Sequence, residues 1–135
     1  MQTKYDFKIL AIDDDKDILL LLKYNLESEG YHVETASSGK KGISIAQKSD
    51  PDLILIDIMM PEMDGIQTCI KLREIDNLKS SHILFLTARA EEYSEVAAFD
   101  AGADDYITKP IKPRALISRI NSFYKKTSAK VKSDK

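Results

Sequence analysis

The chain has 135 residues, of which 43% are hydrophobic, and a formal net charge of −2, so it can build one ordinary core but not two sizeable domains. Its single cysteine excludes an internal disulfide, no Cys/His cluster has zinc-finger spacing, and no apolar stretch reaches the roughly 18 to 20 residues that cross a bilayer. We therefore expect a soluble cytoplasmic protein, and the near-neutral charge does not favour direct nucleic-acid binding by the domain.

Five apolar runs of strand length recur along the chain, separated by segments of helical periodicity. The first helical segment carries Ile18, Leu22 and Leu26, and Gly30 is placed to end it in the left-handed conformation. The last helical segment carries Leu116, Ile120 and Phe123. The runs expected as strands are residues 7–12, 31–35, 53–56, 83–86 and, more weakly, 106–108.

Three of these runs, at residues 9–12, 53–56 and 83–86, are apolar without alternation, as strands buried on both faces should be. Strands that alternate with helices predict an α/β fold, a parallel sheet with helices on both faces. Residues 127–135 are rich in lysine and poor in apolar side chains, so we expect a domain over residues 1–126 followed by a disordered basic tail or linker.

Polar residues follow the runs at the point where ligands bind in doubly wound sheets, beyond the carboxyl ends of the strands. Carboxylates gathered there repel one another, and a bound hard dication, magnesium or manganese, relieves the repulsion. A carboxylate nucleophile, a dication, a hydroxyl and an ammonium are the parts that phosphoryl transfer needs. The candidates are Asp13, Asp14, Asp57, Thr87 and Lys109, while Asp15 is interpreted as a helix cap.

Four motifs follow one another along the chain: ILAIDDD at 9–15, LILIDIMMPEMDG at 53–65, ILFLTA at 83–88 and AGADDYITKP at 101–110. In this order they resemble the receiver domains of two-component response regulators, over about residues 8–124. The resemblance implies a doubly wound, flavodoxin-like sheet of five parallel strands in the order 2-1-3-4-5. It also implies a cytoplasmic switch phosphorylated by a sensor histidine kinase or phosphotransfer protein.

The resemblance also assigns roles at the expected site. Asp57 corresponds to the phosphoacceptor, and Asp13 and Asp14 to the acidic pair that organises Mg²⁺, for which Mn²⁺ is a substitute. Asp14 would bind the metal directly, together with Asp57 and the backbone carbonyl of Met59, and Asp13 would act through water. Lys109 corresponds to the ammonium that pairs with the phosphoryl group, in a chain segment where the family usually has a cis peptide before Pro110.

A second group of roles concerns signalling. Thr87 corresponds to the hydroxyl that turns toward the phosphoryl group, and Tyr106 to the aromatic ring that then rotates. The rotation would remodel the face formed by residues 89–124, so that an effector or output domain binds differently. Met59 and Arg89 occupy the positions that flank the path of attacking water.

Homodimerisation is a further implication of the resemblance. Members with winged-helix output often dimerise through charged pairs on this face when phosphorylated, and Asp105 and Arg119 fit that pattern. Ala115 stands where those members commonly carry glutamate, which argues against the same dimer.

Other interpretations fit the residues less well. A haloacid-dehalogenase-type phosphatase would need threonine or valine where Asp17 stands, and a calcium loop would need glycine at Ile18 and glutamate at Tyr24. His32 and His82 lack a paired base or second ligand and are predicted to be structural, and Cys69 is predicted to be a packed thiol. The remaining alternative is a receiver-like interaction module that works without phosphorylation.

Overall fold

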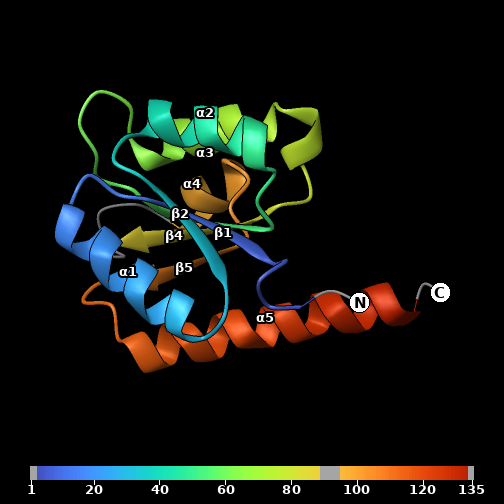
Figure 1. The fold of residues 1–135 in the computed structure, drawn as a ribbon. Coiled ribbons are helices and arrows are strands. Elements are labelled where there is room, and N and C mark those ends of the chain that lie inside the picture. The colour runs from blue at the N-terminus through green and yellow to red at the C-terminus, as the bar shows by residue number, and fades with distance from the viewer. Residues whose placement is uncertain (1–2, 89–94, 134–135) are drawn as a thin grey trace.

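The computed structural model describes residues 3–88 and 95–133, in which strands and helices alternate along the chain (Figure 1). The first half contains β1 (Lys8–Ile12), α1 (Lys16–Ser28), β2 (His32–Ala36), α2 (Gly39–Ser49) and β3 (Leu53–Asp57). The second half contains α3 (Gly65–Arg73), the short 3₁₀ helix η1 (Asp76–Leu78), β4 (His82–Thr87), α4 (Glu95–Asp100), β5 (Asp105–Thr108) and α5 (Pro113–Ser133). Each strand lies within one residue of the run that predicted it.

The five strands form one parallel sheet in the order β2-β1-β3-β4-β5. This order confirms the predicted doubly wound fold, in which the first connection runs to one edge and the later ones to the other. The carboxyl ends of β1 and β3 therefore lie side by side at the centre of the sheet, where the strand order reverses.

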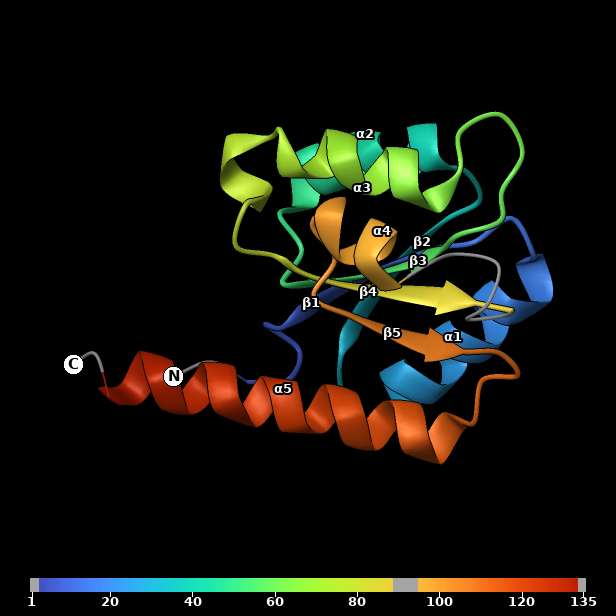
Figure 2. The same ribbon diagram turned by 180° about the vertical axis from the view of Figure 1, so that it is seen from behind.

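Helices cover both faces of the sheet, as predicted: α1 and α5 lie on one face, and α2, α3 and α4 on the other (Figures 1 and 2). Successive residues of each central strand enter opposite cores. In β1, Leu10 and Ile12 pack beneath α2 and α3, whereas Ile9 and Ala11 pack against α1 and α5. Because both faces are buried, the central strands have no polar alternation.

The ends of the first helix are fixed by local chemistry. The Asp15 carboxylate accepts hydrogen bonds from the backbone N–H groups of Asp17 and Ile18, so Asp15 is the predicted cap. Gly30 follows the helix with φ of 99°, the left-handed conformation predicted for it. None of the helices in the described part of the chain is long and apolar enough to span a membrane.

The C-terminal segment differs from the expectation of disorder, because α5 continues to Ser133. Residues 127–133 contain neither glycine nor proline, and lysine and alanine are good helix formers, so the helix extends once the apolar face of its first half is packed. The division of the chain at residue 126 and the role of the segment as a linker stay predictions.

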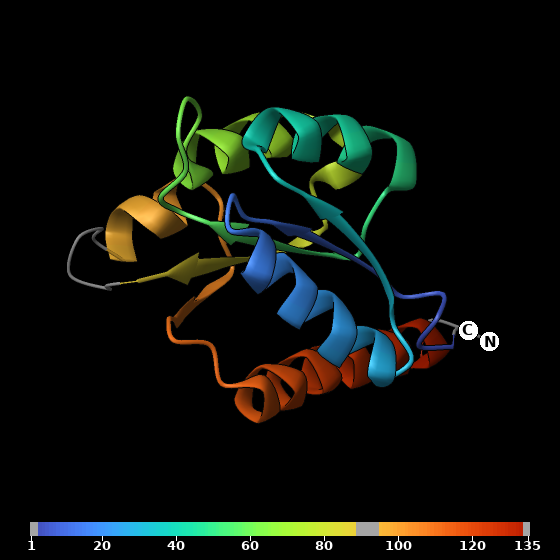
Figure 3. The same cartoon turned by 60° about the vertical axis from the view of Figure 1, so that its left-hand side comes forward.

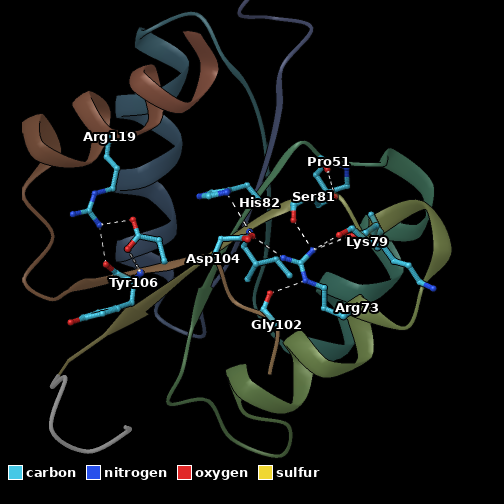
Figure 4. A network of polar contacts seen from close by, with 12 residues as sticks. Pro51, Arg73, Lys79, Ser81, His82, Gly102, Asp104, Tyr106 and Arg119 are labelled. Carbon is cyan, nitrogen blue, oxygen red and sulfur yellow. Dashed lines mark hydrogen bonds and ion pairs between the residues drawn. The ribbon is translucent and has the colours of Figure 1, made fainter. Parts of the chain in front are cut away.

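At the amino-terminal end of the sheet, Arg73 joins α3 to the loops that lead into β4 and β5 (Figure 4). Its guanidinium donates to the carbonyl oxygens of Gly102 and Ser81, at 2.8 and 2.6 Å, and forms an ion pair of 2.8 Å with Asp104. Asp104 in turn accepts from the backbone N–H of Ile83. This network fixes β4 and β5 at the end opposite the predicted site.

Candidate functional site

Parallel pairing brings the predicted residues to one edge of the sheet. Asp57 ends β3 and pairs in register with Leu86, one residue before Thr87 at the end of β4. The backbone N–H of Lys109 donates to the carbonyl oxygen of Thr87 at 2.6 Å, which ties the loop after β5 to β4. On the other side, Asp13 follows β1, which is itself paired with β3.

Lys109 forms the centre of the site. Its Nζ lies 3.0 Å from Oδ2 of Asp13 and 3.2 Å from Oδ1 of Asp57, so one ammonium bridges two carboxylates. Asp13 is completely buried and Asp57 is 4% exposed. Oδ1 of Asp13 also accepts from the backbone N–H of Asp15, which fixes the orientation of this carboxylate.

Burial and crowding raise the pKa values of both buried carboxyls. The pKa of Asp57 rises to about 6, first because of desolvation and then because of the negative charge on Asp13, while Lys109 opposes the shift. Desolvation likewise raises the pKa of Asp13. Desolvation alone would lower the pKa of Lys109, but its hydrogen bond to Asp13 and the two negative charges raise it overall. One ammonium is therefore insufficient to balance the acidic groups.

The acidic cluster is suited to a metal ion. Asp13, Asp14 and Asp57 each offer a carboxylate oxygen, and these oxygens all lie within 4.8 Å of one another. Among the described residues, Lys109 is the only cation that forms an ion pair with them. The excess negative charge and the all-oxygen donors fit a hard dication. A calcium loop is excluded, because α1 already begins at Lys16.

The loop between β3 and α3 depends on a glycine that the sequence prediction did not single out. A Cβ on Gly65 would lie 2.3 Å from the carbonyl oxygen of Asp57 and 2.8 Å from Cα of Ile58. Asp64 caps α3 in a capping box with Gln67, which places Gly65 in the first turn against the site. The Asp64-Gly65 pair that ends the second motif was the signal for this contact.

The predicted switch residues lie in different environments. Thr87 is 3% exposed at the end of β4, next to Asp57 and Lys109 in the sheet. Tyr106 is half-buried in β5, where its ring packs against the core beneath α4. Its carbonyl oxygen accepts from Arg119, which also forms an ion pair of 3.1 Å with Asp105 (Figure 4). The two residues predicted to pair between protomers thus pair within this chain.

Of the two positions predicted to flank the path of attacking water, only Met59 belongs to the described residues. The Met59 side chain is 53% exposed, and Arg89 lies outside the described residues. The peptide bond between Lys109 and Pro110 is cis, as the resemblance implied.

The residues predicted to be structural have structural contacts. His82 stacks on Phe123 at 4.1 Å, and desolvation lowers its pKa. The Sγ atom of Cys69 donates to the carbonyl oxygen of Ala101, and burial raises the pKa of this thiol to about 11. His32 makes an edge contact with the ring of Tyr5.

Comparison with known sequences points to one family. The family model of the response regulator receiver domain matches residues 9–121. The alkaline phosphatase synthesis transcriptional regulatory protein PhoP of Bacillus subtilis is 42% identical over 132 residues, which are 94% of this chain and 54% of PhoP. The transcriptional regulatory protein SrrA of Staphylococcus aureus is 42% identical over 122 residues, 90% of this chain and 49% of SrrA. The chain thus spans about half the length of these curated relatives.

Solved structures agree with the sequence comparison. The chemotaxis protein CheY4 of Vibrio cholerae superposes with a TM-score of 0.82 at 31% identity, over 85% of this chain and 96% of CheY4. A CheY-like response regulator receiver domain protein of Methanospirillum hungatei gives a TM-score of 0.83 at 32% identity, over 91% of this chain and 97% of that chain.

Proposed function

Because this chain belongs to the response regulator receiver domain family of two-component systems, we propose that it is a switch in which Asp57 accepts a phosphoryl group with the help of bound Mg²⁺. One observation carries the proposal: a buried carboxylate at the carboxyl end of β3 lies beside two further acids and contacts the Lys109 ammonium. A purely structural site gains nothing from such crowding, since each buried carboxylate adds a desolvation cost.

In the proposed reaction an oxygen of Asp57 attacks phosphorus, and the bond from phosphorus to the donor group breaks as the acyl phosphate forms. With a pKa of about 6, Asp57 is largely ionised at neutral pH and can act as the nucleophile. Lys109, already 3.2 Å from Asp57, would exchange this contact for one with a phosphoryl oxygen.

We assign the metal to the carboxylates of Asp14 and Asp57 and the backbone carbonyl of Met59, with Asp13 acting through water. Mn²⁺ offers the same preference for oxygen donors and is the expected substitute. When bound, the ion would supply positive charge against the phosphoryl oxygens. Asp13 would meanwhile remain oriented by the backbone of Asp15 and by Lys109.

The phosphodonor in this proposal is a sensor histidine kinase or a phosphotransfer protein, and the phosphorylated domain controls an effector or output domain. The Thr87 hydroxyl would donate to a phosphoryl oxygen, and Tyr106 would rotate toward the vacated space, which changes the face of α4, β5 and α5. A phosphorylation-dependent homodimer on that face would need to replace the ion pair between Asp105 and Arg119 within one chain by a pair between chains.

Intact mass spectrometry after incubation with Mg²⁺ and acetyl phosphate tests the proposal. We expect a gain of about 80 Da, the mass of one phosphoryl group, that requires the metal and is absent in Asp57→Asn. The matched control Asp76→Asn changes a fully exposed acid on η1 and should keep the gain. If the wild type gains no mass, the alternative of an interaction module that works without phosphorylation is favoured.

A further inference from the structure

A pocket of about 470 Å³ opens at the carboxyl end of β2, at the opposite edge of the sheet from β5. β2 lies between α1 on one face of the sheet and α2 on the other (Figures 1 and 3). The first turns of both helices contribute to the lining, which consists of two lysines, three residues with hydroxyl groups and three apolar residues. A volume of this size is typical of small-molecule sites.

Both charged side chains in the lining are cations. Lys16 begins α1, and Lys41 lies in the first turn of α2. Neither of them forms an ion pair with another residue in the described part of the chain. The Lys41 ammonium contacts the hydroxyl of Ser37 at 3.4 Å, which is long for a hydrogen bond. The Asp15 carboxylate, beside Lys16 in the sequence, is engaged in capping α1. The pocket therefore holds two positive charges that no acid in its lining offsets.

Hydroxyl groups form the other polar part of the lining. They belong to Thr35 in β2, Ser37 in the turn that follows and Ser44 in α2. α2 begins beside them, capped by the Ser38 side chain, so the positive end of its helix dipole lies at the same rim. Ammonium and hydroxyl groups donate hydrogen bonds, and a phosphate monoester offers three acceptor oxygens and about two negative charges at neutral pH. The polar lining therefore matches a phosphate group.

The remaining wall of the pocket is apolar. Leu19 of α1 and Ala36 of β2 are buried, and Ile45 of α2 packs against the core beneath that helix. A free phosphate ion would leave this wall in contact with water, whereas an ester could cover it with an aromatic or aliphatic group. Burial of that group would add hydrophobic stabilisation, so the lining favours an organic phosphate over the inorganic ion.

We propose that this pocket binds a small organic phosphate, whose phosphate group lies between Lys16 and Lys41 and whose apolar group lies against Leu19 and Ile45. The two ammonium groups come from different helices and can approach one phosphate from two sides, and each contact is charge-assisted. The pocket has room for the whole ligand, which favours a free small molecule over a phosphorylated side chain of another protein.

The pocket is close to the acidic cluster but separate from it. The carbonyl oxygen of Ala36, in the pocket lining, accepts from the backbone N–H of Asp13 at 3.1 Å. No member of the acidic cluster belongs to the lining, and neither do Thr87 and Lys109. Binding in the pocket therefore requires neither Mg²⁺ nor transfer of a phosphoryl group, and the inference does not depend on the proposed function.

Titration of the full chain with phenyl phosphate in metal-free buffer, followed by NMR of the backbone amides, tests the inference. Without a divalent ion the acidic cluster repels the anion, so binding at Asp57 does not contribute. We expect saturable shifts centred on residues 16–19 and 35–45. The variant Lys16→Gln with Lys41→Gln should bind at least about tenfold more weakly, because it loses charge-assisted contacts. Inorganic phosphate should also bind the wild type more weakly, since it leaves the apolar wall exposed.

A matched control separates the pocket from general charge effects. The variant Lys23→Gln with Lys48→Gln removes one exposed lysine from each of the same two helices, outside the pocket lining, and should bind phenyl phosphate like the wild type. Urea unfolding checks that each variant folds. The inference is overturned if the wild type shows no saturable binding, if the two double variants bind equally, or if inorganic phosphate binds as tightly as phenyl phosphate. Tighter binding of a phosphoserine peptide than of phenyl phosphate would also overturn it, because the pocket would then belong to a protein partner.

Discussion

Replacement of Asp57 by asparagine is expected to stabilise the ligand-free domain, because it removes a buried charge. The pKa of Asp57 is raised from 3.8 to about 6, chiefly by desolvation and then by Asp13. Each pKa unit of this rise corresponds to about 1.36 kcal/mol, so at pH well above 6 the ionisation of Asp57 costs the folded state about 3 kcal/mol. Asparagine keeps the shape of the side chain and can still accept from Lys109, so we expect a gain of about 1 to 3 kcal/mol.

The sign of the effect predicts its pH dependence. Between about pH 4 and pH 6 the folded state keeps a proton on Asp57 that the unfolded state releases, so the stability from this group falls as pH rises through that window. The variant lacks this titration. Its advantage should therefore be largest above pH 6 and approach zero below the unfolded pKa of 3.8.

Urea unfolding followed by circular dichroism, with chelator present, measures both quantities. The control Asp76→Asn changes a side chain that is 98% exposed and should shift the free energy of unfolding by less than about 0.5 kcal/mol. The reasoning is refuted if Asp57→Asn destabilises the domain at neutral pH, or if its gain is the same at every pH.

Three further perturbations address the site. Lys109→Met leaves two buried carboxylates without their ammonium and should lower the free energy of unfolding in urea by about 3 kcal/mol. Adding Asp57→Asn should recover part of this loss. A stability equal to wild type would show that the ion pairs of Lys109 contribute little. Mg²⁺ at a hundred times its dissociation constant should raise the free energy of unfolding of the wild type by about 2.7 kcal/mol. Thermal unfolding of Asp14→Asn should show a much smaller gain at the same Mg²⁺ concentration. Equal gains in the two proteins would mean that Asp14 is not a metal ligand. Gly65→Ala places a Cβ 2.3 Å from the Asp57 carbonyl oxygen, so the loop must shift. We expect the free energy of unfolding to fall by about 1 to 3 kcal/mol and phosphorylation by acetyl phosphate to become slower. A variant with wild-type stability and a wild-type phosphorylation rate would mean that the backbone there adjusts easily.

The sequence predicted the sheet well because its signals are local. Three central strands buried on both faces read as uninterrupted apolar runs, and the polar residue after each run necessarily lies at the carboxyl edge. Asp57 and Thr87 were found in this way, and parallel pairing then brought them together. Lys109 follows a weaker run, and its position relied on the fourth motif.

Features that depend on contacts between distant segments were less accessible. The bridge from Lys109 to Asp13 joins residues 96 positions apart, and its geometry follows from side-chain packing that no local pattern encodes. The ion pair between Asp105 and Arg119 within one chain is similar, since the pattern of charges alone did not distinguish it from a pair between chains. For residues 127–133, composition suggested disorder, whereas α5 simply continues from its packed half.

The central claim is most directly tested by a crystal structure of the domain with Mg²⁺ and beryllofluoride, which mimics a phosphoryl group. The account predicts beryllium bonded to a carboxylate oxygen of Asp57, the metal in contact with Asp14 and Asp57, and the Lys109 ammonium and Thr87 hydroxyl within hydrogen-bonding distance of fluoride. Beryllofluoride on another residue, or a metal ion bound away from these carboxylates, would contradict it.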